Sequence, residues 1–409
     1  MPQRRVADWT DVITIPTLAG IIDSSSYVYI LSRASEITFY TFIILVKAAI
    51  TALKPINLTQ KNRFITFSVI TFFSVILSSL VNESQITAAL RPIAVCISVL
   101  LTIYLIGGKI TDYAKGYAIS GFIICTIFIF SVQTGMIIQT GERHHFLAES
   151  HPNLGGELIS ATLIMSSLTL GPRLFLILSA TSLYCTFLLQ SRTSTLAILI
   201  VFLCYGIAYL RGKFGVRRTV LLSLVVVWIT AAFTATLAAI QSEAANQAFD
   251  FIYNSVFLVE DQYRGGYSGV SGRDEHWWEA IRVAMDHPFI GAGPDFVERL
   301  GVLQPHNWTL YAISQFGMLG WVLVIIFGHA AFRALRNDPV RAMVLIPLFV
   351  PWLLNDRFLN FNAYPFALYI IVFAGFSLPP TKRGSSAPNR PTSPKHAIAL
   401  AARYRQVAR

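Results

Sequence analysis

The sequence predicts an all-α polytopic membrane protein, with about twelve transmembrane helices and one large loop that carries short amphipathic helices. Of the 409 residues, 54% are hydrophobic and only 13% are charged, and the mean hydropathy is +0.58. Apolar runs long enough to cross a hydrocarbon core of roughly 30 Å recur along most of the chain. This composition excludes a soluble globule of ordinary size.

The expected membrane spans are continuous apolar stretches separated by polar connections. The first is the weakest, because Asp23 and the serines after it lower its hydrophobicity, and the eleventh is short. In chain order the expected spans are 12–31, 37–53, 64–81, 86–106, 117–139, 154–170, 173–190, 193–210, 219–240, 307–328, 341–355 and 360–378.

The distribution of lysine and arginine predicts that both termini are cytoplasmic, because short loops rich in basic residues stay on that side. Alternate connections are basic, and the opposite side's short connections hold few such residues. The net charge of +11 is therefore a topology signal that also suits anionic lipid headgroups, and it needs no nucleic-acid partner. The basic connections include Lys54, Lys61, Arg63, Arg211, Lys213, Arg217 and Arg218, and the other side has Arg33, Arg143, Arg192 and Arg357.

The pattern divides the chain into four regions. Residues 1–240 hold the first nine spans, 241–306 form the large exoplasmic loop, and 307–378 hold the last three spans. Residues 379–409, rich in proline, serine and basic residues, are expected to form a disordered cytoplasmic tail.

No metal or cofactor is expected. The four cysteines lie inside apolar spans and are typical of small buried hydrophobic residues. The histidines at 144, 145 and 151 lack the carboxylate-supported helical spacing of a metal site.

The large loop contains two segments with helical periodicity. Apolar residues over 249–257 follow the spacing of an amphipathic helix that lies on a bilayer surface. A second helix is expected over 275–286, with Trp277, Ile281, Ala284 and Met285 on its apolar face. The two tryptophans, Trp277 and Trp278, are candidates to stack on a sugar or to anchor the loop at the interface.

A titratable side chain stands where this loop meets the next apolar span. His306 and Asn307 form this boundary, so the sequence puts an imidazole at a membrane surface beside the longest polar segment. The structural alternative is that the pair caps the start of the following helix. Within the spans, Asp23 and Lys47 are expected to pair across neighbouring helices, and Gly317 and Gly320 to allow close helix packing.

Four short motifs occur in a defined order. They are His151-Pro152-Asn153; Ser191-Arg192-Thr193; Gly272-Arg273 with Trp277 or Trp278, followed by His287-Pro288-Phe289-Ile290-Gly291-Ala292-Gly293; and His306-Asn307 with Gly317 and Gly320. In this order and at these topological positions they resemble the O-antigen ligase and polysaccharide polymerase superfamily of bacterial membrane glycosyltransferases. The resemblance covers about residues 140 to 330.

The resemblance implies an inner-membrane enzyme of lipopolysaccharide or exopolysaccharide biosynthesis whose active site faces the periplasm. Such a metal-independent, inverting glycosyltransferase takes a glycan from undecaprenyl diphosphate and passes it to a sugar hydroxyl. Its expected partners are the lipid-linked glycan donor, a lipid A-core or growing polysaccharide acceptor, and membrane lipids. A ligase and a polymerase both remain open, and the single dominant loop favours a ligase.

The residue types fit this chemistry. Arg192 and Arg273 are the expected catalytic arginines, because guanidinium groups hold a diphosphate through charge-assisted bidentate hydrogen bonds and stabilise the leaving charge. His306 is the expected catalytic base for the acceptor hydroxyl. Further contacts to sugar or diphosphate are expected from Arg143, Asn153, Arg282 and Asn307.

Each assignment has a structural alternative. Arg192 is also compatible with a positional anchor between two spans, and Arg273 with an ordinary loop arginine. A function of another class, a lipid-linked sugar transporter or flippase, is weakly supported because the sequence shows no internal repeat and few intramembrane charges.

Overall fold

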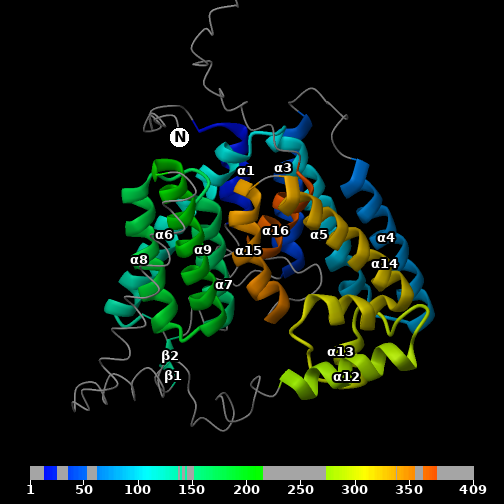
Figure 1. Cartoon of the computed structure of the whole chain (residues 1–409). Helices are drawn as coiled ribbons and strands as arrows, with labels where there is room; N and C mark the ends of the chain where they lie inside the picture. Colours follow the sequence, from blue (N-terminus) through cyan, green and yellow to red (C-terminus); the bar gives the residue numbers. More distant parts are fainter. Residues whose placement is uncertain are drawn as a thin grey trace, which may run out of the picture. The chain divides into compact units, whose positions relative to one another are not determined.

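The computed structural model describes residues 13–24, 36–52, 62–136, 139–140, 143–144, 152–214, 273–337, 339–354 and 363–374. All of them belong to one compact unit, Met1–Ala374 (Figure 1). The regular structure of the described residues is helical apart from an antiparallel pair of two-residue strands, β1 (Gln139–Thr140) and β2 (Arg143–His144). The predicted all-helical class is confirmed for this part of the chain.

The helices follow the expected apolar segments in order. Every expected span except 219–240 overlaps one of the helices. The span 219–240 and the predicted surface helix at 249–257 lie outside the described residues. The bounds are α1 Ile15–Ser24, α3 Glu36–Ala52, α4 Asn62–Asn82, α5 Ile86–Ile106, α6 Ile110–Gln133, α7 Pro152–Ser166, α8 Pro172–Leu188, α9 Arg192–Phe214, α12 Arg273–Asp286, α13 Phe296–Leu300, α14 Trp308–Asn337, α15 Pro339–Leu354 and α16 Ala363–Phe373.

The fifth expected span, 117–139, differs from the observed helix at both ends, since α6 is Ile110–Gln133. The fifth span was expected to begin at residue 117, but α6 begins at Ile110. Its first turns contain Asp112 and Lys115, which form an ion pair at 2.9 Å. The helix therefore begins before the apolar stretch, because backbone hydrogen bonds and i,i+3 charge pairs form without hydrophobic side chains.

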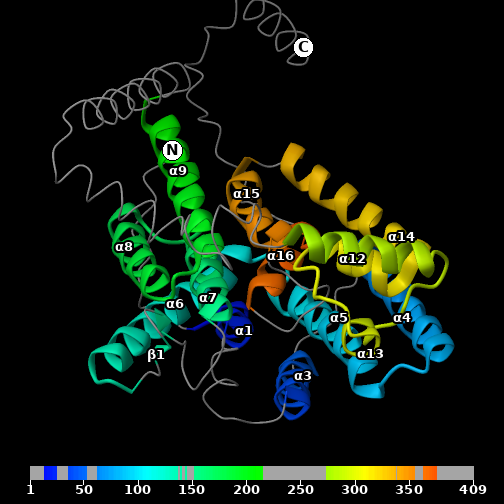
Figure 2. The same ribbon diagram turned by 90° about the horizontal axis from the view of Figure 1, so that it is seen from below.

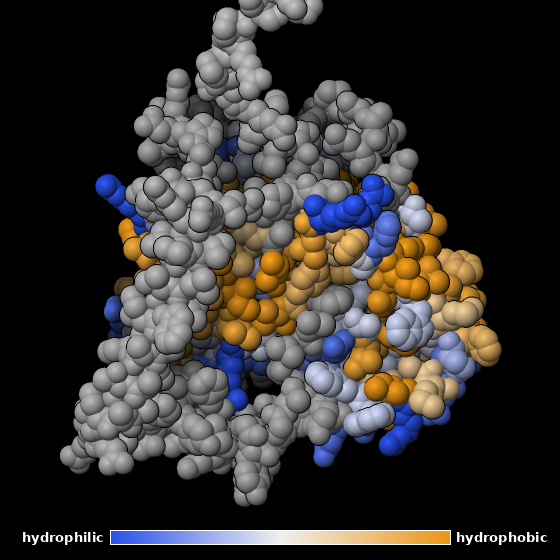
Figure 3. All heavy atoms as spheres, in the orientation of Figure 1, coloured by the Kyte–Doolittle hydropathy of each residue, from blue (hydrophilic) through white to orange (hydrophobic). Residues whose placement is uncertain are grey.

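Within the described residues, five helices are long and apolar enough to cross a membrane. They are Phe64–Asn82, Ile86–Ile106, Ile110–Gln133, Arg192–Leu210 and Trp308–Arg336, the last of which contains a break at Gly317, and further shorter apolar helices accompany them. On the face in Figure 3, hydrophobic residues cover the sides of the helices and hydrophilic ones gather near α12 and α13. Large exposed apolar side chains on α4 and α14, such as Phe73, Ile76, Trp321 and Ile325, fit a lipid-facing surface.

The centre of the unit is α7. Residues 155–168 are all buried, and α7 packs against α6, α8, α9, α15 and α16. A second group of helices forms around α14, which contacts α4, α12, α15 and α16. Figure 2 shows α7 and α9 on one side of α15 and α16, with α12 and α14 on the other.

Close backbone contact joins α1 to α6. A Cβ on Gly20 would stand 2.1 Å from the Tyr113 carbonyl oxygen, and one on Gly116 would stand 2.3 Å from the Thr17 carbonyl oxygen. Ser24 also donates a hydrogen bond to Ser120 at 2.7 Å. Small residues thus let two membrane helices touch along their backbones.

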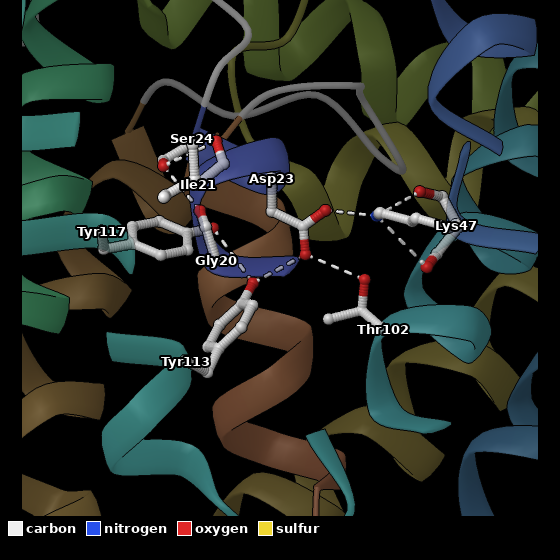
Figure 4. Close-up of polar contacts among 9 residues, drawn as sticks. Gly20, Ile21, Asp23, Ser24, Lys47, Thr102, Tyr113 and Tyr117 are labelled. Atoms are coloured by element: carbon white, nitrogen blue, oxygen red, sulfur yellow. Dashed lines mark hydrogen bonds and ion pairs between the residues drawn. The ribbon is translucent and has the colours of Figure 1, made fainter. Parts of the chain in front are cut away.

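The predicted pairing of Asp23 with Lys47 is confirmed. The two side chains form an ion pair between α1 and α3, and both are fully buried (Figure 4). Thr102 and Tyr113 donate hydrogen bonds to Asp23 Oδ2 at 2.9 and 2.8 Å. The Lys47 ammonium donates to Ser98 Oγ at 2.6 Å, and it lies 4.6 Å from the centre of a ring of α16, Phe366. The pair therefore connects five helices, α1, α3, α5, α6 and α16.

Candidate active site

The helix α14 is broken at Gly317, whose φ of 54° and ψ of −127° are not helical. The two halves, 308–316 and 318–337, fold back on each other, because the ring centres of Trp308 and Phe327 are only 4.9 Å apart. A Cβ on Gly320 would stand 2.1 Å from the Ala312 carbonyl oxygen, which confirms the predicted close packing at this glycine.

The break corrects the tenth expected span. Residues 307–328 do not form one continuous helix, and the uninterrupted part is 318–337, about 30 Å long at 1.5 Å per residue. The expectation was wrong because hydropathy continues smoothly through Gly317, whereas the chain direction depends on a backbone conformation that favours glycine.

The loop between α12 and α13 hydrogen-bonds the backbone groups that the break leaves without helical partners. The N–H groups of Ala292 and Gly293 donate to the carbonyls of Ser314 and Gln315 at 2.8 and 3.0 Å. The Met318 N–H donates to the Pro288 carbonyl at 2.8 Å. Buried backbone polar groups need such partners, so the loop stabilises the sharp turn at Gly317.

Glycines make this contact possible. Gly291 and Gly293 have φ of 77° and 91°, and a Cβ on Gly291 would stand 2.2 Å from the Gln315 carbonyl oxygen. On α4, Ser78 donates to the Gln315 carbonyl at 2.9 Å, and Asn82 donates to the Gly291 carbonyl at 3.1 Å. The motif at 287–293 thus has a clear structural role, which is to clamp the broken helix.

The next residues after this motif include a buried carboxylate. Asp295 Oδ2 accepts the Gln85 N–H at 2.9 Å, and Asp295 Oδ1 lies 3.5 Å from Arg299 Nε. Burial disfavours the charged form of Asp295, but the hydrogen bond from Gln85 and the Arg299 charge outweigh it and lower the pKa of this carboxyl.

The helix α12 packs on α14 through a narrow stripe. Ala280 and Val283 are buried, and Ser314 Oγ donates to the Ala280 carbonyl at 2.8 Å. The expected apolar face is wrong at Met285, which is 73% exposed. Helical periodicity predicted a wider buried face than α14 covers. Trp278 is exposed, whereas the indole N–H of Trp277 is buried and has no hydrogen-bond partner among the described residues.

His306 is held in an unusual backbone conformation between α13 and α14. Its φ is +47°, uncommon for a residue other than glycine, and its side chain is half-buried. Asn307 Oδ1 accepts the Leu310 N–H at 3.1 Å, so Asn307 caps α14. The capping alternative thus holds for Asn307.

Two residues of α12 that sequence reasoning missed tie down the segment before His306. His276 Nδ1 lies 2.6 Å from the Gln304 carbonyl oxygen, and Glu279 accepts the Leu303 N–H at 2.6 Å. The rings of His276 and His306 have their centres 5.8 Å apart. The i,i+3 spacing of His276 and Glu279 on a predicted helix is a signal, but only the fold shows which segment they contact.

Arg192 is the first residue of α9 and is half-buried. Before it, Gln190 has a φ of +50°, and buried Ser191 donates to Ser194 at 2.9 Å. A Cβ on Gly156 of α7 would stand 2.4 Å from Ser191 Oγ. The first turns of α7 and α9 are therefore adjacent, and this brings Asn153, near the start of α7, into the neighbourhood of Arg192.

The remaining candidates are placed less fully. Arg143 lies in β2 and Arg273 begins α12, but their side chains are outside the described residues. Arg282 is exposed on α12. No three His, Cys, Asp or Glu residues of the described ranges are grouped as metal ligands would be.

The candidates belong to two groups of helices with α16 between them. His306 and Asn307 precede α14, whereas Asn153 and Arg192 begin α7 and α9. Trp308 donates from Nε1 to the Tyr369 hydroxyl of α16 at 2.7 Å, and α16 packs on α7.

Comparison with protein families gives one relevant match. A family model described as O-antigen ligase matches residues 174–325. No curated protein and no solved structure matches the chain. The matched stretch includes Arg192, Arg273, Arg282, His306 and Asn307, and it ends after the break at Gly317. The resemblance inferred from the four motifs is thereby confirmed, and residues 174–325 are similar to the O-antigen ligase family.

Proposed function

We propose that this protein is a metal-independent, inverting glycosyltransferase of the bacterial inner membrane. It would move a glycan from undecaprenyl diphosphate to a sugar hydroxyl of lipid A-core, as an O-antigen ligase does. The observation that carries the proposal is the family match over residues 174–325, which includes a half-buried imidazole, His306, in a tethered segment beside apolar helices.

In the proposed reaction, His306 takes the proton of the acceptor hydroxyl. The oxygen then attacks the anomeric carbon, the bond from that carbon to the phosphate oxygen breaks, and undecaprenyl diphosphate leaves. A neutral imidazole suits this step because its reference pKa of about 6.5 keeps much of it unprotonated near neutral pH. The uncommon backbone conformation of His306 fits a functional constraint.

Arg192 and Arg273 would hold the diphosphate and stabilise the charge that develops on it. The start of α9 supports this role for Arg192, since the N-terminal end of a helix favours anions. Asn153, near the start of the adjacent α7, would add a polar contact. Arg143, Arg282 and Asn307 are proposed to contact sugar or phosphate from the loop side.

The proposal carries a topology in which both termini are cytoplasmic and the site faces the periplasm. In Figure 1, α12, α13 and the β1–β2 pair lie at the same end of the helices. Cysteines introduced at the exposed positions 278 and 285 test this orientation. In cells with a permeabilised outer membrane, both should react with a thiol reagent that does not cross the inner membrane. Labelling only after the inner membrane is opened would contradict it.

A reconstituted assay tests the reaction. Proteoliposomes receive lipid-linked glycan and lipid A-core, and His306→Ala and Arg192→Ala are each expected to lower transfer by about 100-fold or more. Matched controls are His329→Ala and Arg173→Ala, which change exposed residues of α14 and α8 and should leave transfer unchanged. Full transfer by correctly inserted His306→Ala and Arg192→Ala variants would refute the assignment.

The acceptor distinguishes the related activities. If deletion of the gene leaves long glycan chains on the lipid carrier and lipid A-core without chains, the protein is a ligase. If deletion leaves lipid A-core capped by a single repeat unit, the protein is an O-antigen polymerase. Loss of secreted polymer with intact lipopolysaccharide indicates an exopolysaccharide polymerase. Carrier-linked glycan that moves across the membrane without transfer to any acceptor would indicate a flippase.

A further inference from the structure

The ring of His276, on α12, lies beside the ring of His306. The two ring centres are 5.8 Å apart, with an angle of 34° between the ring planes. Both side chains are half-buried. Two imidazoles from separate segments therefore meet at the entrance to α14.

The hydrogen bond of His276 fixes the form of its ring. Its Nδ1 lies 2.6 Å from the Gln304 carbonyl oxygen. A carbonyl only accepts hydrogen bonds, so Nδ1 carries the hydrogen. In the neutral ring, Nε2 is then unprotonated and is the basic nitrogen.

The surroundings keep this ring in place. One turn further along α12, Glu279 accepts the Leu303 N–H at 2.6 Å, so the carboxylate is engaged by the same segment. Ser314 Oγ binds the Ala280 carbonyl at 2.8 Å and fixes α12 to the first half of α14. His276 and His306 are thus positioned by contacts on both sides of the segment that joins α13 to α14.

We propose that His276 is a second residue of the proton-transfer machinery, and this rests on the proposed transferase function. When one nitrogen of His306 takes the acceptor hydroxyl proton, the proton on its other nitrogen passes to His276 Nε2, directly or through one water. His306 returns to neutral, and His276 becomes an imidazolium whose Nδ1–H stays on the Gln304 carbonyl. The proton then leaves to water, so the step balances without another reactant.

Replacing His276 by Asn separates this role from tethering. The Asn amide N–H is placed to donate to the Gln304 carbonyl, as Nδ1–H does, but the basic nitrogen is absent. We expect kcat for transfer to fall about 100-fold with KM for the lipid-linked donor unchanged. Added imidazole should restore part of the rate of His276→Ala. Glu279→Ala is the matched control, because it removes the neighbouring tether and no transferable proton, and imidazole should not restore it.

Wild-type kcat in His276→Asn would overturn the inference. The inference would also be overturned if the loss of kcat in His276→Ala were not restored by imidazole and were reproduced by Glu279→Ala. Both variants would then act only by weakening the contact of α12 with the segment before His306. If the variants do not fold, nitrogen NMR of histidine-labelled wild-type protein still decides, because a hydrogen on Nε2 instead of Nδ1 of neutral His276 contradicts the relay. An inactive His306→Ala beside a fully active His276→Asn would remove only this inference, whereas an active His306→Ala would remove the proposed function.

Discussion

The buried pair between Asp23 and Lys47 predicts a large and non-additive effect of removing either charge. Both side chains have 0% exposure, so Lys47→Met would leave a carboxylate buried without its counter-charge. Breaking such a pair typically costs about 3–5 kcal/mol. The hydroxyls of Thr102 and Tyr113 still donate to Asp23 Oδ2, which puts the expected loss near the lower end, about 3 kcal/mol.

The double variant Asp23→Asn with Lys47→Met removes both charges and keeps approximate shape. Its cost is expected to be smaller than the sum of the single losses by about 2 kcal/mol or more, because neither partner is left as an isolated buried charge. Equilibrium unfolding in detergent, followed by tryptophan fluorescence, measures the four members of the cycle. Losses that add would refute the reasoning.

The chain offers an internal control for this cycle. The pair of Asp112 and Lys115 has side-chain exposures of 21% and 29%. Lys115→Met should cost less than about 1 kcal/mol because water screens the pair. The proposed function also predicts that the Asp23 and Lys47 double variant retains glycan transfer, since this pair has a structural role. Lost transfer in a stable double variant would instead favour a transport role for these charges.

Three further predictions follow from the site. Gly317→Ala should destabilise the protein by about 1–3 kcal/mol, since alanine is strained at a φ of 54°. Gly206→Ala should not destabilise it, because a Cβ at Gly206 meets nothing within 4 Å. Thermal unfolding compares the two variants. Asn307→Ala should cost about 1 kcal/mol through loss of the helix cap, and Asn307→Asp should restore stability; equal stability of all three proteins would exclude capping. Asp295 has a lowered pKa, so the stability that its charge contributes is present above the unfolded pKa of about 3.9 and is lost as pH falls through the lower folded pKa. Asp295→Asn should flatten the fall in melting temperature over that acid range. An unchanged acid transition would contradict the lowered pKa.

The sequence by itself determined the membrane class, the order of the helices and the segments that hold the candidate site. The hydropathy profile follows directly from the order of the residues, so α5 was predicted at its observed bounds, Ile86–Ile106. A charge inside an apolar span requires a partner, and this requirement alone paired Asp23 with Lys47. The four motifs, taken together and in order, predicted the resemblance to O-antigen ligases that the family model confirms for residues 174–325.

The tertiary structure decided how these segments meet. Nothing in the hydropathy of α14 marks the reversal at Gly317, because that reversal is one backbone conformation stabilised by a loop from earlier in the chain. His276 lies inside the predicted helix over 275–286 but was not predicted as a site residue, and its contact with the segment before His306 depends on how α12 docks on α14. Local patterns report what a segment can form and bury, whereas a site that joins two helices is fixed by packing and hydrogen bonds between distant residues.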